Sequence, residues 1–246
     1  LVSKVGRFVG NEMMRNIMGQ QKSGFDFRDI MDNQKILLVN LSKGKTGEVN
    51  AKLLGLIVVA KLQMAAMGRA DMAEEDRKDF YLYIDEFQNF ITDSISTILS
   101  EARKYKLDLI VGHQYMGQLV DDKGKADVRD AILGNVGTMM RGRIGPDDAE
   151  ILAKEFAPVF GSYDLINAPQ YSFYTKMLIQ NQASKPFLMR AHPPEKGNPE
   201  LAAAIKQLSR LKYGRDKRIV EAEILERTKL DQPDKTGSSE ASEATL

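Results

Sequence analysis

The stretch FYLYIDEFQNF, Phe80 to Phe90, decides the fold. Its first five residues are aromatic or branched, and they predict a short buried β-strand over Phe80–Ile84. The strand ends abruptly in two adjacent carboxylates, Asp85 and Glu86. At the carboxyl edge of a parallel sheet, side chains enter the ligand crevice. Two acids in that position are costly unless a cation or a reacting water uses them.

An apolar strand followed by Asp-Glu has the form of a Walker B motif. In that form Asp85 would hold the shell of a Mg²⁺ ion, usually through water. Glu86 would polarise the attacking water. The alternative interpretation is a strand that runs into an acidic turn, with both carboxylates in solvent.

The next expected strand, Leu107–Gly112, strengthens the Walker B interpretation because it ends in His113 and Gln114. An amide at the sheet edge could sense a γ-phosphate and hydrogen-bond the attacking water, so Gln114 is a candidate sensor. His113 is interpreted as a packed or solvated histidine rather than a ligand. The sequence has only one other histidine, His192, and a histidine-rich metal site is therefore not expected.

Three arginines are candidates for contacts with an anion. Arg103 lies near the end of an amphipathic helix expected over Ser94–Lys106, and Arg141 and Arg143 lie on a strand expected over Val136–Ile144. Strand alternation would put Arg141 and Arg143 on the same face. One anion they could meet is a phosphate across a subunit interface, as an arginine finger does. For each arginine, a solvated surface position is the alternative.

Strands that alternate with helices predict a largely parallel sheet covered by helices. The chain before residue 35 is expected to be helical and polar, with Asp26 as an N-cap. The further elements expected are strands at Lys35–Leu41, Tyr171–Ile179 and Pro186–Ala191, helices at about Val49–Met67, Asp127–Leu133 and Pro146–Phe156 (started by Asp147 or Asp148), and a charged loop at 68–79.

Gly44-Lys45-Thr46 is the ending of a phosphate-binding P-loop, G-x-x-x-x-G-K-[ST]. The first glycine of that motif would have to stand at position 39, which is Val39. Val39 lies inside the apolar run that predicts a buried strand. We therefore interpret Lys45 as part of a polar turn and not as a P-loop lysine.

Composition narrows the class of protein. The chain has 246 residues, a formal net charge of +1 and no cysteine, so no disulfide framework or thiolate metal site is expected. No signal peptide is visible. In the most apolar helix, Lys52 and Lys61 bracket Leu53–Ala60, which is shorter than the roughly 20 residues that cross a bilayer. We expect no membrane contact from this chain. A membrane anchor upstream of Leu1 is compatible with this expectation.

The sequence from Glu200 onward has a helical pattern that Gly214 interrupts. Its basic cluster, opposed only by Asp216, could face DNA or an acidic partner, or be a solvated surface; the cluster consists of Lys206, Arg210, Lys212, Arg215, Lys217 and Arg218. The tail from Asp231 has few apolar residues and is expected to be disordered.

Five blocks of the sequence, in their order along the chain, resemble the C-terminal half of a HerA/FtsK-superfamily ATPase. The most similar group is the type IV secretion and conjugation ATPases, including TraG/TraD-type coupling proteins. The blocks are KILLVNLSKGKTGEVNAKLLGLIVVAKLQ, FYLYIDEFQNF, ILSEARKYKLDLIVGHQYMGQL, ILGNVGTMMRGRIGPDDAEILAKEFAP and SRLKYGRDKRIVEAEI. Gly142 stands before Arg143, where family members tend to have an aromatic residue.

The resemblance implies an α/β fold: a RecA-like P-loop NTPase core that is truncated at its N-terminus and extended by helices. It implies a partial ATPase domain over 1–195, a helical extension over 196–230 and a disordered tail over 231–246. The family's Walker A loop is expected upstream of Leu1, so this chain alone is expected to be inactive. The implied ligands are ATP and Mg²⁺, with Asp85, Glu86 and Gln114 at the site and Arg103 or Arg143 as the finger.

The function implied is ATP-driven DNA translocation by a homo-hexamer that contacts relaxosome or type IV secretion components. The implied location is cytoplasmic, at the inner face of the membrane if an upstream anchor exists. Rival functions are a secretion or pilus-assembly ATPase and a HerA-like DNA helicase. A rival of another class is a non-catalytic docking module for relaxosome or secretion partners.

Overall fold

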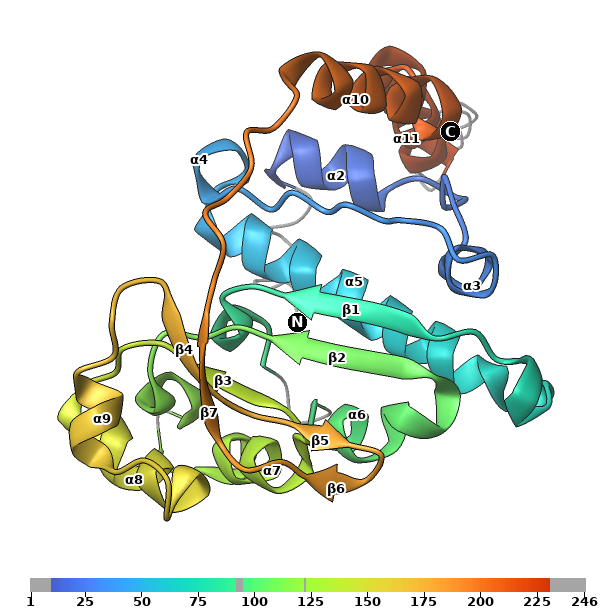
Figure 1. Cartoon of the computed structure of the whole chain (residues 1–246). Helices are drawn as coiled ribbons and strands as arrows, with labels where there is room; N and C mark the ends of the chain where they lie inside the picture. Colours follow the sequence, from blue (N-terminus) through green and yellow to red (C-terminus); the bar gives the residue numbers. More distant parts are fainter. Residues whose placement is uncertain (1–9, 92–94, 122, 231–246) are drawn as a thin grey trace, which may run out of the picture. The chain divides into compact units, whose positions relative to one another are not determined.

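The computed structural model describes residues 10–91, 95–121 and 123–230. The chain forms two compact units (Figure 1). The large unit is Phe27–Lys196, and the small unit combines described residues 10–26 with 197–230. The expected disordered tail lies outside the described residues.

The large unit contains one parallel strand pair, and it is the pair that the sequence predicts. β1 (Phe80–Ile84) runs parallel to β2 (Leu107–Val111), with Phe80 opposite Leu107 and Ile84 opposite Val111 (Figure 1). The connection contains α6 (Ile95–Glu101) and a 3-10 turn, Ala102–Tyr105, so the expected helix is shorter and its last turn is tighter. Because the strands are parallel, the residues that follow Ile84 and Val111 emerge at the same sheet edge.

α5 (Glu48–Gly68) agrees within one residue at each end with the helix expected from the sequence. Its buried positions lie on one face and are Ala51, Gly55, Leu62 and Ala66. By length and composition alone, Glu48–Asp71 is apolar enough to cross a membrane, which differs from the expectation from the sequence. Leu62 and Ala66 belong to the hydrophobic core of the large unit, so one face of the helix packs against that core.

The expected strand Lys35–Leu41 is wrong as a member of the sheet. The segment joins no strand, and within the described chain no backbone hydrogen bond is made by the N–H groups of residues 36–41. Ile36 and Leu38 are 89% and 77% exposed. The apolar pattern indicated a preference for burial, but a strand also needs a partner edge, which local sequence does not supply.

The expectation of a largely parallel sheet is also wrong for the described residues. β3 (Met139–Arg141), β4 (Ser172–Lys176) and β7 (Phe187–Arg190) form a separate antiparallel sheet in the order β3-β4-β7. β5 (Leu178–Ile179) and β6 (Gln182–Ala183) form a small hairpin. Alternation of strands and helices does not fix strand direction, and here the chain returns from β3 through two helices to pair antiparallel with it.

The remaining helices of the large unit are short. They are α3 (Phe27–Asp32), α4 (Lys43–Thr46), α7 (Asp127–Asn135), α8 (Pro146–Phe156) and α9 (Ser162–Ile166). Asp26 immediately precedes α3, as expected. In α8 the N-cap is Gly145, so Asp147 and Asp148 lie inside the first turn, where carboxylates favour the positive end of the helix dipole.

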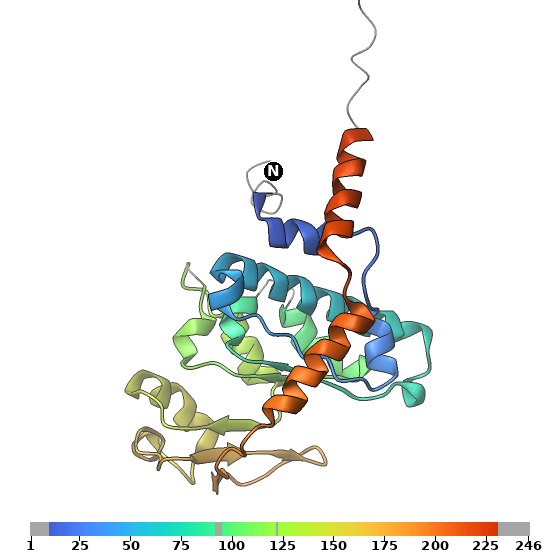
Figure 2. The ribbon, with the colours of Figure 1, turned by 90° about the horizontal axis from the view of Figure 1, so that it is seen from above.

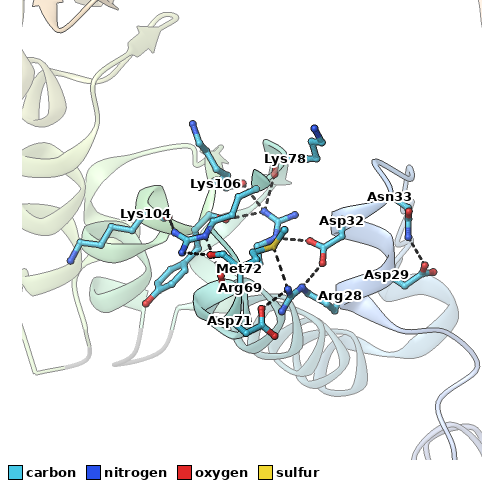
Figure 3. A network of polar contacts seen from close by, with 12 residues as sticks. Arg28, Asp29, Asp32, Asn33, Arg69, Asp71, Met72, Lys78, Lys104 and Lys106 are labelled. Carbon is cyan, nitrogen blue, oxygen red and sulfur yellow. Dashed lines mark hydrogen bonds and ion pairs between the residues drawn. The ribbon is translucent and has the colours of Figure 1, made fainter. Parts of the chain in front are cut away.

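Arg69 fixes the amino-terminal edge of the parallel pair (Figure 3). Its side chain is completely buried and forms an ion pair with Asp32 Oδ1 at 2.9 Å. Its Nη1 donates to the carbonyl oxygens of Lys78 and Tyr105, both at 2.8 Å. One arginine therefore joins α3 and the end of α5 to the residues that enter β1 and β2.

The small unit consists of α2 (Glu12–Met18), α10 (Pro199–Tyr213) and α11 (Lys217–Leu230) (Figure 2). Asn16 Nδ2 donates to Glu221 Oε1 at 2.9 Å. Lys217 pairs with Glu12, and Met14 and Val220 are buried. These contacts join residues 10–26 to the C-terminal helices in one compact unit.

Candidate functional site

The two carboxylates lie on a sharp turn at the end of β1. Gly112 N donates to Ile84 O at 3.0 Å, and Phe87 N donates to Gly112 O at 2.9 Å, so β2 holds the backbone on both sides of the acid pair. Glu86 has φ 49° and ψ 48°, in the left-handed region. That conformation is rare for a residue with a Cβ and costs roughly 1–2 kcal/mol. Such strain occurs preferentially at functional sites.

The turn gives the two acids different surroundings. Asp85 Oδ1 accepts a hydrogen bond from Glu86 N at 2.9 Å. The extended geometry required for strand alternation ends before Glu86, so the pleat does not decide where the two side chains point. The difference between the acids comes instead from their hydrogen bonds, because Glu86 is bound by two side-chain amides.

Gln114 is the first of these amides: its Nε2 donates to Glu86 Oε1 at 2.8 Å. Gln88 Nε2 donates to Glu86 Oε2 at 2.5 Å. The hydrogen bonds from Gln114 and then Gln88 hold the pKa of Glu86 below its ordinary value, and the positive charge of Lys43 acts in the same direction. Glu86 is therefore ionised at neutral pH. The sequence assigned Glu86 and Gln114 to one site but missed Gln88, whose only signal was its place two residues after the glutamate.

A cavity of about 1050 Å³ opens beside the acid pair. Asp85, Glu86 and Asn89 line its polar part together with Ser42 and Lys43. Its apolar part lies between β1 and the extended segment before Ser42, and is lined among others by Ile36, Leu38, Leu41, Tyr81 and Tyr83. Ser42 and Lys43, which the sequence did not single out, thus bring the start of the stretch that resembles a P-loop ending to the wall of this cavity.

The donor set suits a hard cation shared with phosphates. Mg²⁺ prefers oxygen ligands and is usually held by one or two carboxylates plus phosphate oxygens rather than by an all-protein cage. Among the described residues no group of three or more His, Cys, Asp or Glu could hold a metal alone. Asp85 and Glu86 fit the sparse type of site, in which a nucleotide would complete the coordination.

Arg103 does not reach this site within one chain. It lies in the turn before β2, and Gln114 follows the other end of that strand. The strand has five residues, which at about 3.3 Å each separates its two ends by roughly 16 Å. Arg103 is exposed, and its Nη2 lies 3.4 Å from Asn181 Oδ1.

Arg141 and Arg143 have different environments. Arg141 is the last residue of β3; its Nη1 lies 3.4 Å from His113 Nε2, and its buried Nε has no partner among the described polar atoms. Burial lowers the pKa of Arg141, which stays charged at neutral pH. Arg143 lies beyond the strand and donates to the carbonyl oxygen of Ala168 at 3.2 Å. The structure brings neither arginine into contact with Glu86.

His113, which follows β2, lies beside Arg141 of the second sheet. Its Nδ1 lies 3.2 Å from the carbonyl oxygen of Tyr115, and its Nε2 lies close to Arg141. Asp148 accepts from Met116 N through both oxygens, at 3.1 and 3.0 Å. The hydrogen bonds between Met116 and Asp148 thereby anchor the segment after Gln114 to α8.

The basic cluster of the small unit has more acidic partners than the sequence showed. Arg215 pairs with Glu223, Lys217 with Glu12, and Arg218 with Asp216. The expectation that only Asp216 opposes the cluster is therefore wrong, because helix packing brings the other acids near it. For Lys206, Arg210 and Lys212 the described structure contains no ion pair.

The site consists of an acidic turn at the end of β1 that is hydrogen-bonded to Gln114 beyond the end of β2. Residues 79–189 match the family model described as "TraM recognition site of TraD and TraG". This segment contains both parallel strands, the acid pair and Gln114. Over these residues the chain is similar to the C-terminal region of TraD and TraG proteins, in agreement with the resemblance seen in the sequence.

Solved structures show more distant likenesses. The bacterial conjugative coupling protein TrwBdeltaN70 is 18% identical, with a TM-score of 0.43 over 54% of this chain and 36% of that one. The genome packaging NTPase B204 from Sulfolobus turreted icosahedral virus 2, in complex with ATP-gammaS, is 14% identical, with a TM-score of 0.42 over 66% and 71%. The chain spans about a third of the coupling protein's length, and no curated protein sequence matches it.

Proposed function

We propose that this chain is part of an ATP-driven motor of the conjugative coupling type, which moves DNA during type IV secretion. One observation carries the proposal: Gln114 Nε2 binds Glu86 Oε1 at 2.8 Å, across the ends of two adjacent parallel strands. Both residues lie inside the segment that matches the TraG/TraD family model.

In this proposal Asp85, Glu86 and Gln114 have separate tasks. Bound Mg-ATP would supply the phosphoryl group and neutralise its charge. Asp85 would contact the metal shell, usually through water. Glu86 is ionised and held in place by two amides, so it can accept a hydrogen bond from the attacking water and polarise it. Gln114 would sense whether the γ-phosphate is present and transmit this to β2, the strand that it follows.

The arginines fit this scheme only between subunits. Arg103 lies at the opposite end of β2 from Gln114. We therefore propose that Arg103 or Arg143 acts as a finger on the site of a neighbouring subunit, in a homo-hexamer. Mixing an Arg103→Ala protein with a Glu86→Gln protein should then restore part of the activity, because some interfaces regain an intact site. No recovery at any mixing ratio would contradict a role in trans.

The proposed partners are DNA and a relaxosome or type IV secretion component. The family description, which names TraM recognition by TraD and TraG, supports the second of these. Lys206, Arg210 and Lys212, exposed on α10, are the residues proposed to face DNA. The proposed location is cytoplasmic, at the inner face of the membrane.

The test compares Glu86→Gln and Asp85→Asn in the longest natural protein that contains this sequence, because the sequence itself has no complete P-loop motif. Glu86→Gln should lower ATP hydrolysis by about 10²-fold or more, the usual scale for loss of a general base, while ATP binding survives. Asp85→Asn should instead weaken Mg²⁺-dependent binding.

Glu150→Gln on the exposed surface of α8 is the matched control and should hydrolyse ATP like the parent. If Glu86→Gln also hydrolyses ATP like the parent, the catalytic proposal fails. The same family description then favours the second candidate function, a non-catalytic docking module for a TraM-like protein.

A further inference from the structure

Gly55 of α5 allows the segment around Leu41 and the segment that follows the acid pair to pack close to each other. A Cβ added at Gly55 of α5 would lie 2.1 Å from Phe90 Cε1 and 2.9 Å from Leu41 Cδ1. Phe90 is four residues after Glu86, and Leu41 is two residues before Lys43. The absence of a side chain at position 55 therefore lets the two segments meet over the same point of α5.

The turn that carries Lys43 is held by its own hydrogen bonds. Ser42 N donates to Asn40 Oδ1 at 3.0 Å, and Thr46 Oγ1 donates to Ser42 O at 3.0 Å. Gly47, with φ 77°, donates its N–H to Lys43 O at 3.0 Å and ends the turn. Because the backbone is fixed on both sides, the position from which the Lys43 side chain projects is defined.

The present partner of Lys43 is a weak one. Its Nζ lies 2.9 Å from Glu48 Oε1, and the two side chains are 56% and 73% exposed. Exposed ion pairs of this kind contribute only about 0–1 kcal/mol. The lysine can therefore exchange Glu48 for a more highly charged anion at little cost.

The cavity beside the acid pair places Lys43 where an anion would need a cation. Its polar part contains Asp85 and Glu86, and Lys43 is on the same wall as Ser42. A polyphosphate that approaches two carboxylates is repelled unless positive charge is close. Lysine is a common phosphate ligand, which acts as a compact point charge.

We propose that Lys43 is a phosphate-binding residue of this site. When a nucleotide binds, the Lys43 side chain breaks its ion pair with Glu48 and contacts the triphosphate beside Asp85 and Glu86. The inference rests on the proposed function, because it takes a nucleoside triphosphate as the ligand. It assigns a role to the stretch that resembles a P-loop ending, but to Lys43 rather than to Lys45.

The experiment measures the Kd of a non-hydrolysable ATP analogue and of adenosine, in the longest natural protein that contains this sequence. Lys43→Gln should weaken binding of the analogue about tenfold, the scale of one charge-assisted contact. Binding of adenosine, which has no phosphate, should not change. Lys43→Arg should restore part of the affinity, and Glu48→Gln should leave the affinity equal or higher.

Lys61→Gln is the matched control, since Lys61 is exposed on α5 and does not line the cavity. Thermal unfolding of each variant verifies that the protein is folded. If Lys43→Gln binds the analogue as Lys61→Gln does, while Glu86→Gln abolishes hydrolysis, the role of Lys43 is wrong and the motor proposal stands. If Glu86→Gln retains hydrolysis, both fail.

Discussion

Gln114 and Glu86 are 28 residues apart in the chain, yet the amide nitrogen of Gln114 lies 2.8 Å from Glu86 Oε1. The contact exists because β1 and β2 run parallel and in register, so both residues leave the sheet at the same edge. It also makes the pKa of Glu86 depend on a residue of the neighbouring strand's extension, Gln114.

Removal of the Gln114 amide should raise the pKa of Glu86. The hydrogen bond from Gln114 is the largest cause of the lowered pKa, and the bond from Gln88 is the second. A lowered pKa means that the stabilisation is present above the ordinary value of 4.5 and is lost as the pH falls through the folded-state pKa. NMR titration of the Glu86 carboxyl should give a higher pKa in Gln114→Ala and a smaller rise in Gln88→Ala. An unchanged pKa in both variants would contradict the hydrogen-bond network.

The left-handed backbone of Glu86 predicts that glycine is more stable than alanine at this position. Glycine adopts φ 49° without a clash of Cβ, whereas alanine keeps the clash. Both substitutions remove the carboxylate and its two amide contacts. Glu86→Gly should therefore be more stable than Glu86→Ala by roughly 1–2 kcal/mol, measured by urea unfolding. Equal stability of the two variants would show that the turn relaxes.

Gly55 should not tolerate a methyl group. A Cβ at this position overlaps the Phe90 ring at 2.1 Å, so Gly55→Ala should lower the free energy of unfolding by about 1–3 kcal/mol. Gly134 in α7 is the matched control, because a Cβ there meets nothing within 4 Å. Gly134→Ala should be neutral or stabilise the protein by roughly 0.5–1 kcal/mol. Similar losses in both variants would contradict the packing described for Gly55.

Arg69 should be one of the residues most sensitive to substitution. Arg69→Met fills much of the same space but leaves the carbonyl oxygens of Lys78 and Tyr105 without their donor. It also removes the buried partner of Asp32. We expect Arg69→Met to lower the free energy of unfolding by about 3 kcal/mol, measured by thermal unfolding. Arg129→Met, which breaks a partly exposed pair with Asp130, should cost less than about 1 kcal/mol in the same thermal unfolding assay.

Local sequence predicted the elements that depend on local pattern. The bounds of β1 and α8 agree with the expectation, and those of α5 agree within one residue at each end. Sequence also placed Glu86 and Gln114 at one sheet edge, since that inference needs only two parallel strands. It could not predict that β3 pairs antiparallel with β4, because pairing is decided by residues more than thirty positions apart.

Two features of the candidate site could not be predicted for similar reasons. The left-handed backbone of Glu86 is imposed by hydrogen bonds to Gly112 on the neighbouring strand. Lys43 reaches the cavity only because Leu41 and Phe90 both pack on Gly55. Neither relation leaves a signal in the local sequence, where Lys43 is one of two lysines in a polar turn.

The last prediction concerns His113 and the stability of the protein in acid. Burial is the main cause that lowers the pKa of His113 below its ordinary value of 6.5, and the charge of Arg141 acts in the same direction. The carbonyl oxygen of Tyr115 and the carboxylate of Asp148 act in the opposite direction and only partly offset them.

A lowered histidine pKa means that the unfolded chain binds the proton more readily than the folded one. Between the folded-state pKa and about 6.5 the unfolded state therefore carries more protons, and stability falls as the pH falls. Above this window the contribution of His113 does not depend on pH.

We expect His113→Gln to reduce the loss of stability between pH 6.5 and pH 5, measured as the urea midpoint at a series of pH values. Glutamine keeps a polar side chain near Arg141 but cannot be protonated in this range. His192→Gln is the control, because His192 lies exposed beyond β7 and should leave the slope unchanged. If His113→Gln has the same slope as the parent, His113 is not the group that senses acid, and its place beside Arg141 has no energetic consequence in this range.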